Sequence, residues 1–420
     1  MRKFFLIFIF IYCSLDFCFA QSGWFPQNSG TGYQLNSICV INTNESYVAG
    51  SVGTVLKTTD GGNNWQTLQS TTQQALCCVS FINSQTGWVC GYNGIILKTM
   101  NGGNNWILQQ SGLVTTLRSI YFTGSSCGWT VGVGGTIIRT TDGGNNWAQI
   151  PFSTISTLTG IYFINDTIGI TVGFDLTLAR SYNGGQNWNR IFFGGFNYNF
   201  YSINMGSADT GWIVGSFGII KRTINKGVSW VTQSNTHTFT LNSVYSKNNL
   251  AWAVGDSDCI LKTSNSGLNW SIYPTGRVEE KLGISFVDAS TGWIVGINGM
   301  ILKTTTGGEP IGIKPISSEI PKSYFLSQNY PNPFNPSTKI KFSVPLLNQG
   351  GVAPTEVGDG VVSVIIFDIL GREVTTIVNE QLHPGIYEAE FDGTNYPSGV
   401  YFYKLVTDGF TETKRMVLLK

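Results

Sequence analysis

Few side chains in this 420-residue sequence could carry out acid–base chemistry. Outside a set of repeated turns, carboxylates are sparse, and only two histidines occur. The carboxylates best placed to act as a pair are Asp256 or Asp258 with Glu279 or Glu280. Glycoside hydrolysis requires two carboxyl groups about 5–10 Å apart across the scissile bond. No arginine cluster or tyrosine–glutamate nucleophile pair accompanies these acids, so we predict no catalytic residues.

Aromatic and charged side chains gather where the sequence departs from its repeating pattern. The segment Phe192–Phe200 is unusually aromatic, and residues 277–281 are mostly charged. Such side chains on a rigid scaffold are typical of binding surfaces, although ordinary exposed loops carry them too. We predict a binding surface for an unidentified protein or glycan, formed by Phe193, Phe196, Tyr198, Asp175, Asp256, Asp258, Arg277, Glu279 and Glu280.

The scaffold that must position these residues is a repeat of about 41 residues. The stretch Thr58–Trp65 returns six times, and its last copy, Thr304–Gly308, lacks the terminal Trp. A fixed period of this length indicates stacked units that cannot bury their apolar faces alone. The Trp of each copy belongs to the series Trp24, Trp65, Trp106, Trp147, Trp188, Trp230 and Trp270.

Each unit contains four short runs of β-branched and aromatic residues between Gly and Asn turns, which indicates four strands. Seven such units predict an all-β chain with a seven-bladed β-propeller over residues 21–309. The seventh unit lacks its fourth strand, whereas Gly23–Ser29 has the pattern of a fourth strand without a unit. We therefore expect this segment to pair with the last blade and close the ring.

All twelve Trp residues fall into two columns of the repeat. Large aromatic residues at matching places in successive blades would fill the wedge between neighbouring sheets. We therefore interpret every Trp as structural rather than ligand-binding. The second column, on the second strand, consists of Tyr47, Trp88, Trp129, Ile170, Trp212, Trp252 and Trp293.

The turn between the third and fourth strands carries Asp60 and Asp142 in two units and Asn in most others. The pattern Ser/Thr-x-Asp-x-Gly-x-x-Trp resembles the Asp-box of sialidase-type propellers, which is a folding motif and implies no glycosidase chemistry. With Gly-Trp-x-Val-Gly and Gly-x-Ile-Leu-Lys-Thr, it makes residues 23–309 resemble the propeller family of photosystem II assembly and stability factors. The resemblance implies the fold and leaves the partner open.

One column of the repeat is always cationic. We interpret it as a strand end whose stems pack on the sheet, with the charges near the Asp-box carboxylate or turn carbonyls. The alternative is a ring of positive charge for an acidic partner. The column consists of Lys57, Lys98, Arg139, Arg180, Arg222, Lys262 and Lys303.

No cofactor or metal site is predicted, because the sequence has no CxxC pair and its two histidines lie in different domains. Cys90 occupies a column that is otherwise filled by Ala or Val. We therefore predict a buried, reduced thiol that behaves as a small apolar residue.

Residues 1–20 have the pattern of a secretory signal: a basic start, the apolar run Phe4–Leu15 and a small-residue cleavage site. We expect Sec-dependent export to the periplasm. A membrane anchor is the alternative, disfavoured because the apolar run is short and Asp16 interrupts it. No other stretch is long and apolar enough to span a bilayer. Cleavage would leave equal numbers of acidic and basic residues, so we expect no nucleic-acid partner.

The pattern changes after Pro310. Residues 310–323 predict a Pro-containing linker, and the strand pattern of 324–420 predicts a small β-sandwich. Residues 324–420 resemble the C-terminal sorting domain of the type IX secretion system, through the Asn-Tyr-Pro-Asn-Pro-Phe-Asn-Pro lead, Phe367–Val374, Pro397–Tyr401 and a basic, apolar tail. The motif residues are Asn329, Pro331, Asn332, Pro333, Phe334, Asn335, Pro336, Gly371, Lys414 and Arg415.

This resemblance implies contact with the type IX machinery and a final place outside the cell or on the outer-membrane surface. We therefore predict a secreted or surface-held, non-catalytic binding propeller. An Asp-box glycoside hydrolase is one alternative. A photosystem II assembly factor is another, which the sorting domain disfavours because it directs the protein out of the cell.

Overall fold

The computed structural model describes residues 23–193, 198–235, 237–275, 277–309, 313–317, 321–345, 360–382, 384–394, 396–407 and 409–420. The predicted secretory signal, residues 1–20, lies outside them. The chain divides into two compact units, Ser22–Glu309 and Pro310–Lys420.

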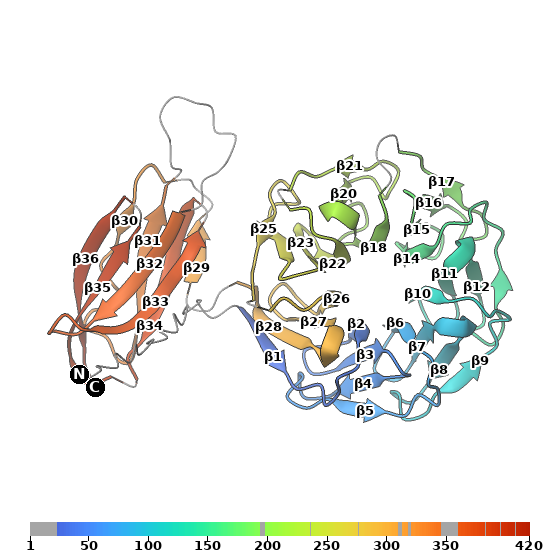
Figure 1. Ribbon diagram of the computed structural model, residues 1–420, viewed down its shortest axis with the longest axis horizontal. Helices are drawn as coiled ribbons and strands as arrows, with labels where there is room; N and C mark the ends of the chain where they lie inside the picture. Colours follow the sequence, from blue (N-terminus) through green and yellow to red (C-terminus); the bar gives the residue numbers. More distant parts are fainter. Residues whose placement is uncertain are drawn as a thin grey trace, which may run out of the picture. The chain divides into compact units, whose positions relative to one another are not determined.

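The first unit is a closed ring of seven four-stranded antiparallel sheets within the described residues (Figure 1). In chain order, blades one to three consist of β2 (Leu35–Val40), β3 (Ser46–Gly50), β4 (Val55–Thr58) and β5 (Gln66–Leu68); β6 (Leu76–Phe81), β7 (Gly87–Gly91), β8 (Ile96–Thr99) and β9 (Ile107–Gln109); β10 (Leu117–Phe122), β11 (Gly128–Gly132), β12 (Ile137–Thr140) and β13 (Ala148–Gln149).

Blades four to six consist of β14 (Leu158–Phe163), β15 (Gly169–Gly173), β16 (Leu178–Ser181) and β17 (Asn189–Arg190); β18 (Phe200–Met205), β19 (Gly211–Gly215), β20 (Ile220–Thr223) and β21 (Val231–Thr232); β22 (Leu241–Lys247), β23 (Leu250–Gly255), β24 (Ile260–Thr263) and β25 (Ser271–Ile272). Blade seven consists of β26 (Lys281–Phe286), β27 (Gly292–Gly296), β28 (Ile301–Gly308) and β1 (Gly23–Gln27).

Aromatic rings fill the wedges between blades, as the two Trp columns predict. Trp88 and Trp129 are fully buried on the second strands of blades two and three. Each stacks on the Phe that ends the first strand of the next blade, with ring centroids 3.5 Å and 3.6 Å apart. The Trp of that next blade's Asp-box contacts the same Phe edge-on. The stacked pairs join neighbouring blades and the edge-on contacts pack within a blade, so the two columns together stabilise the ring.

The N-terminal strand closes the ring, which confirms that prediction. β1 pairs antiparallel with β28, from Gly23 opposite Gly308 to Gln27 opposite Ile301. Trp24 is buried with its edge against Phe286. Closure therefore gives blade seven the fourth strand that its own segment lacks.

The described residues of the second unit form two four-stranded antiparallel sheets. The first has the order β29 (Ile313–Ser317), β34 (Gly385–Asp392), β31 (Ser337–Val344) and β30 (Phe325–Leu326). The second has the order β33 (Glu373–Leu382), β32 (Gly360–Phe367), β35 (Gly399–Val406) and β36 (Thr411–Leu418).

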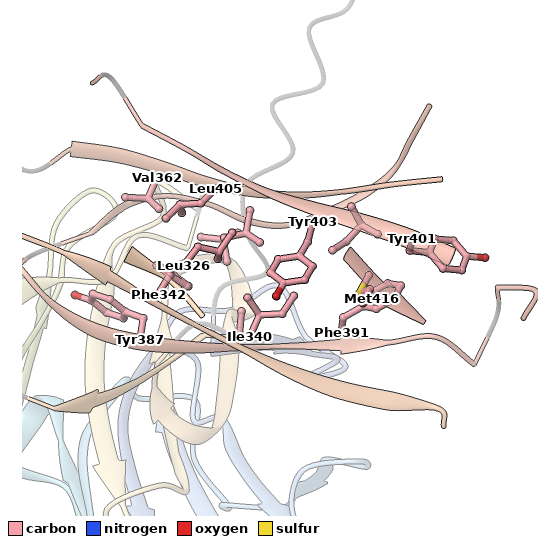
Figure 2. Packing of buried hydrophobic residues seen from close by; sticks show 14 of the residues in the cluster. Leu326, Ile340, Phe342, Val362, Tyr387, Phe391, Tyr401, Tyr403, Leu405 and Met416 are labelled. Carbon is pink, nitrogen blue, oxygen red and sulfur yellow. The ribbon is translucent and has the colours of Figure 1, made fainter. Parts of the chain in front are cut away.

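Side chains from both sheets form one core, as expected for a small β-sandwich. Ile340 and Phe342 contribute from the first sheet, and Tyr403, Leu405 and Met416 from the second (Figure 2). All five are fully buried.

The structure differs from the predicted linker at residues 313–317. These residues form β29, which pairs antiparallel with β34. Pro315 lacks a backbone N–H, but β29 is the edge of its sheet, where a strand tolerates Pro. Proline content alone therefore did not separate a linker from an edge strand.

Candidate functional site

One end of the propeller carries both the turns between second and third strands and the connections between blades. We call this end the connection face. The turns are bonded to the connections on both sides: the N–H groups of Tyr92 and Ile297 donate to Ala75 O and Glu280 O, before their own blades, and that of Gly53 donates to Gln74 O, after its blade. Residues of consecutive blades therefore lie next to one another on this face.

The turns of the connection face share a residue in the left-handed backbone region, which is strained for most side chains. Several of these positions are Asn, Ser or Asp, for which the strain is small. Phe217 (φ 54°), Val52 (φ 54°) and Leu176 (φ 53°) are the bulky exceptions. Phe217 is 69% exposed, so an aromatic ring is presented to solvent from a strained turn.

Phe217 was not predicted as a site residue. The sequence feature that could have indicated it is a bulky side chain at a turn position that Asn or Gly fills in blades two, three and seven.

The predicted aromatic residues of the blade four–five connection are largely packed. Phe193 lies edge-on to Phe200, and the Lys221 ammonium lies 4.4 Å from the centroid of the Phe193 ring. Tyr198 lies edge-on to Phe217, and its carbonyl accepts from the N–H of Leu176. These rings support the connection more than they present a surface. Phe196 lies outside the described residues.

Asp175 is held in the turn next to this connection. Its Oδ2 accepts from Ser156 Oγ at 2.9 Å, and its N–H donates to Asn199 Oδ1 at 3.2 Å. The structure therefore brings Asp175 close to the Tyr198 backbone and fixes it there.

The predicted charged residues of blades six and seven come together around a buried lysine. The side chain of Lys281 has no exposed surface, and its Nζ donates to the carbonyls of Ser257, Arg277 and Glu279 at 3.0–3.2 Å. Asp258 Oδ1 lies 3.5 Å from the same ammonium. Burial lowers the pKa of Lys281, and the charge of Asp258 opposes that shift. Lys281 thus ties a turn of blade six to the connection that follows it.

Lys281 was named in the charged connection but was not predicted as its organiser. It occupies the first position of the inner strand, which is Leu in five other blades and Phe in the remaining one. A charged residue in an apolar column was the signal.

Asp256 and Glu280 lie on either side of one amide. Asn242 Nδ2 donates to Asp256 Oδ1 at 3.2 Å and to Glu280 Oε1 at 3.1 Å. Burial, followed by the nearby Asp256 charge, raises the pKa of Glu280. The structure therefore brings these two predicted acids together and ties both to the side chain of Asn242.

Arg277 and Glu279 line an open pocket of about 230 Å³ beside the closing strand, together with Gln27, Asn28 and Asn298. Arg277 Nη2 lies 3.3 Å from Glu279 Oε1. The pocket mixes amide, charged and apolar groups.

The Asp-box acids are structural. Asp60 Oδ1 and Asp142 Oδ1 each accept from the backbone N–H four residues later, at 2.9 Å. Asn101 and Asn183 accept the same bond in their own blades. The amide oxygen therefore replaces the carboxylate, and no chemistry is assigned to these positions.

The cationic column contacts turn carbonyls, as expected, but those of the next blade. Lys57 Nζ donates to Gly102 O at 3.3 Å, and Arg180 Nε donates to Lys226 O at 2.8 Å. Lys57 also pairs with Glu45 at 3.1 Å. These cations join blades and do not form a free ring of positive charge at these two positions.

Within the described ranges, no three His, Cys, Asp or Glu side chains are grouped so as to hold a metal ion. Over the same ranges, no helix has the length and apolar character needed to cross a membrane.

The Asn- and Pro-rich segment at the start of the sorting domain, residues 328–336, lies along the last described strand, β36. We call this segment the lead. Gln328 Nε2 donates to Arg415 O at 2.8 Å, and Asn332 Oδ1 accepts from Val417 N at 3.0 Å. The backbone of Phe334 bonds Val417 and Leu419, both at 2.9 Å. The lead therefore covers part of the free edge of β36, an edge that would otherwise be open to pairing.

Other residues of the sorting motif stabilise turns of the domain. Asn329 is buried, and its Nδ2 donates to Pro331 O and Thr338 Oγ1. Gly371 (φ 77°) lies in a turn in which Asp368 Oδ1 accepts from the N–H groups of Leu370 and Arg372. Lys414 pairs with Glu412 at 3.1 Å.

Two family models match the chain. Residues 63–155 match the photosynthesis system II assembly factor YCF48, and residues 328–419 match the secretion system C-terminal sorting domain. A search of curated protein sequences finds no match.

Solved structures share the fold. YCF48 bound to D1 peptide is 20% identical over 68% of this chain and 97% of that chain, with a TM-score of 0.58. YCF48 from Cyanidioschyzon merolae is 18% identical over 67% and 98%, with a TM-score of 0.56. PorZ, described as a bacterial surface component of the type-IX secretion system of Porphyromonas gingivalis, is 13% identical over 90% of this chain and 59% of that chain, with a TM-score of 0.54.

At these identities, the likeness to solved structures shows the fold alone. The family models add that the chain joins a propeller similar to YCF48 to a type IX secretion sorting domain, and is thus a secreted propeller.

Proposed function

We propose that the propeller is a non-catalytic binding module that acts outside the cell and binds a protein or glycan on its connection face. The signal segment and the sorting domain would deliver it through the periplasm to the surface or the medium. The ligand would contact the turns and connections of the blades.

The observation that carries the proposal is the set of exposed apolar side chains at the turns of this face. Val52, Tyr92 and Val133 are 38–43% exposed, and Phe217 is 69% exposed. Val52 and Phe217 also have backbone in the left-handed region, which is strained for these side chains. The Phe217 ring contacts Tyr198 edge-on and still remains mostly exposed. Strain combined with exposed apolar surface is typical of ligand-binding positions.

A polypeptide ligand has additional support. In the structure named for it, YCF48 is bound to a peptide of D1. The photosystem role of that protein does not transfer, because a sorting domain directs this chain out of the cell. The glycosidase alternative has little support, because the carboxyl groups of Asp256 and Glu280 are both tied to the Asn242 amide.

The test is a binding screen of the full chain against glycan and surface-protein arrays, with a hydrolysis readout on the same arrays. Phe217→Gly removes the ring while relieving the strained turn, so it should weaken binding without loss of thermal stability. Ile224→Ser is the matched control, because Ile224 is 65% exposed at the opposite end of the same strand, β20. Equal binding by both variants would contradict the proposal, and product release would favour the hydrolase.

A further inference from the structure

The second sheet of the sorting domain has an outer face that is unusual for a sandwich. In each strand the side chains alternate between the core and the outside. In β35, Tyr401, Tyr403 and Leu405 are buried in the core. The alternate residues, Val400 and Phe402, therefore lie on the outer face.

The strand register places these outer residues side by side. Phe402 lies opposite Phe367 on one neighbour and Arg415 on the other. Lys404 lies opposite Ile365, and Val400 lies opposite Val417. The apolar members are half-buried, and none belongs to the core cluster. We call this surface the β35 face, formed by Ile365, Phe367, Val400, Phe402, Lys404, Arg415 and Val417.

The outer face of the first sheet carries charged side chains where the β35 face carries apolar ones. There Lys339 and Lys341 lie opposite Glu390 and Glu388, and both lysines pair with Glu388 at 2.8 Å and 3.8 Å. That face is charged and internally neutralised, as expected for a surface that meets water. The β35 face has half-buried apolar residues at the equivalent positions. Neighbouring apolar side chains that stay partly exposed and are flanked by charged ones are typical of interaction sites.

The charges of the β35 face indicate the partner. Within the described part of the chain, no ion pair joins Lys404 or Arg415 to a carboxylate. Glu373, on β33, lies opposite Phe367 and accepts from Thr376. Glu412, on β36, lies opposite the buried Leu405 and pairs with Lys414. A complementary surface would combine apolar side chains with carboxylates.

We propose that the β35 face is the surface by which this domain docks on an acidic, apolar surface of the type IX export machinery. This rests on the proposed export of the chain through its sorting domain. The match to the sorting-domain model spans 328–419 and includes all three strands that form the β35 face. The lead residues cover the part of the β36 edge next to Arg415 and Val417, so at these positions the face is more open to a partner than the edge.

To test this, the full chain is expressed in a bacterium with an active type IX system, and the exported fraction of the protein is measured. Phe402→Gln combined with Arg415→Glu should reduce the exported fraction on the order of tenfold and leave protein in the periplasm. Lys404→Glu, which changes no apolar contact, should reduce it as well. Lys341→Glu on the outer face of the first sheet is the matched control and should export normally. Unchanged thermal unfolding of the purified variants would show that they fold.

Normal export of both β35-face variants, with a chain lacking residues 324–420 retained in the periplasm, would overturn the docking surface while the sorting role stands. Normal export of the chain that lacks residues 324–420 would instead overturn the sorting role. If the wild-type chain dimerises in sedimentation experiments and the double variant is monomeric yet exported, the face joins two copies of this chain and the proposal is wrong.

Discussion

Lys303 Nζ donates a hydrogen bond to the carbonyl oxygen of Gly61 at 2.7 Å, although 242 positions separate the two residues. The bond links the third strand of blade seven to the Asp-box turn of blade one. It repeats at the ring closure the contact that Lys57 makes with Gly102 between blades one and two. The closure therefore uses the same interblade contact as the rest of the ring, in addition to the pairing of β1 with β28.

The closing strand is predicted to be essential for the stability of the propeller. Trp24→Ala should lower the free energy of unfolding by about 3–5 kcal/mol, because it empties a buried aromatic site. Deletion of residues 21–30 should expose the edge of β28 and cause aggregation. Denaturant unfolding and light scattering measure the two effects. A deletion variant with the melting temperature of the chain that lacks only residues 1–20 would contradict the role of β1.

Cys90 is a free, fully buried thiol, which confirms its prediction as a small apolar residue. Burial raises its pKa well above the ordinary value, so the thiol stays protonated and unreactive. Cys90→Val should change the free energy of unfolding by less than about 1.5 kcal/mol. Cys90→Asp should be far more damaging, since it buries a carboxylate without a partner. Peptide mapping that found Cys90 in a disulfide would overturn this assignment.

Asp142 should make the propeller sensitive to acid. Hydrogen bonds from the backbone and side chain of Asn146 lower the pKa of Asp142 to about 2. A carboxyl group with a lowered pKa stabilises the fold above its unfolded pKa of 3.8 and loses that contribution as the pH falls toward 2. Asp142→Asn should keep the turn, as Asn101 does in blade two. The melting temperature of this variant should fall less than that of the wild type between about pH 4 and pH 2. Asn101→Asp is the reciprocal control and should steepen this fall.

Asp256→Asn should stabilise the protein at neutral pH. The pKa of Glu280 is raised in the fold by burial and by the Asp256 charge, so stability is highest when Glu280 is protonated and falls as the pH rises. The Asn side chain keeps an oxygen for Asn242 and removes the charge. The fall in melting temperature from pH 4 to pH 7 should therefore become smaller. A variant that melts lower than the wild type at pH 7 would show that Asp256 stabilises the turn in another way.

Removing the terminal segment Gly409–Lys420 should block export and leave the propeller intact. The truncation deletes β36 with the buried Met416 and Leu418, and it leaves the lead residues Asn332 and Phe334 without their partners. The protein should accumulate in the periplasm with a normally folded propeller. Fractionation and limited proteolysis measure both outcomes. Efficient surface display without the segment would instead favour an adhesive role for the domain.

Much of the propeller was predictable because its blades repeat. A 41-residue period, two Trp columns and one missing strand were enough to place the sheets and the closure. The contacts between blades were harder to predict from the sequence. The side chain of Lys57 was expected near a turn carbonyl, but the sequence could not indicate that Gly102 of the next blade supplies it, since that depends on the angle between sheets.

The candidate site was predictable only in part. The charged residues of blades six and seven were identified by their departure from the repeat, and the structure brings them together. Phe193 and Tyr198 were chosen by composition, yet they pack against neighbouring rings, because an aromatic residue in a connection can bury itself as readily as face solvent. Phe217 instead carries the exposed ring, and the left-handed conformation of its turn could not be predicted from amino-acid composition.

The position of β28 has a mechanical consequence. The chain leaves the propeller at the end of this strand, and β28 is bonded on one side to β27 and on the other to β1. A pull on the chain beyond Glu309 therefore loads two ladders at once, whereas an outermost strand would peel from a single neighbour. A propeller tethered from this end would withstand drag for as long as β1 stays paired, so β1, the first described strand, holds β28 in place against a pull from the sorting domain.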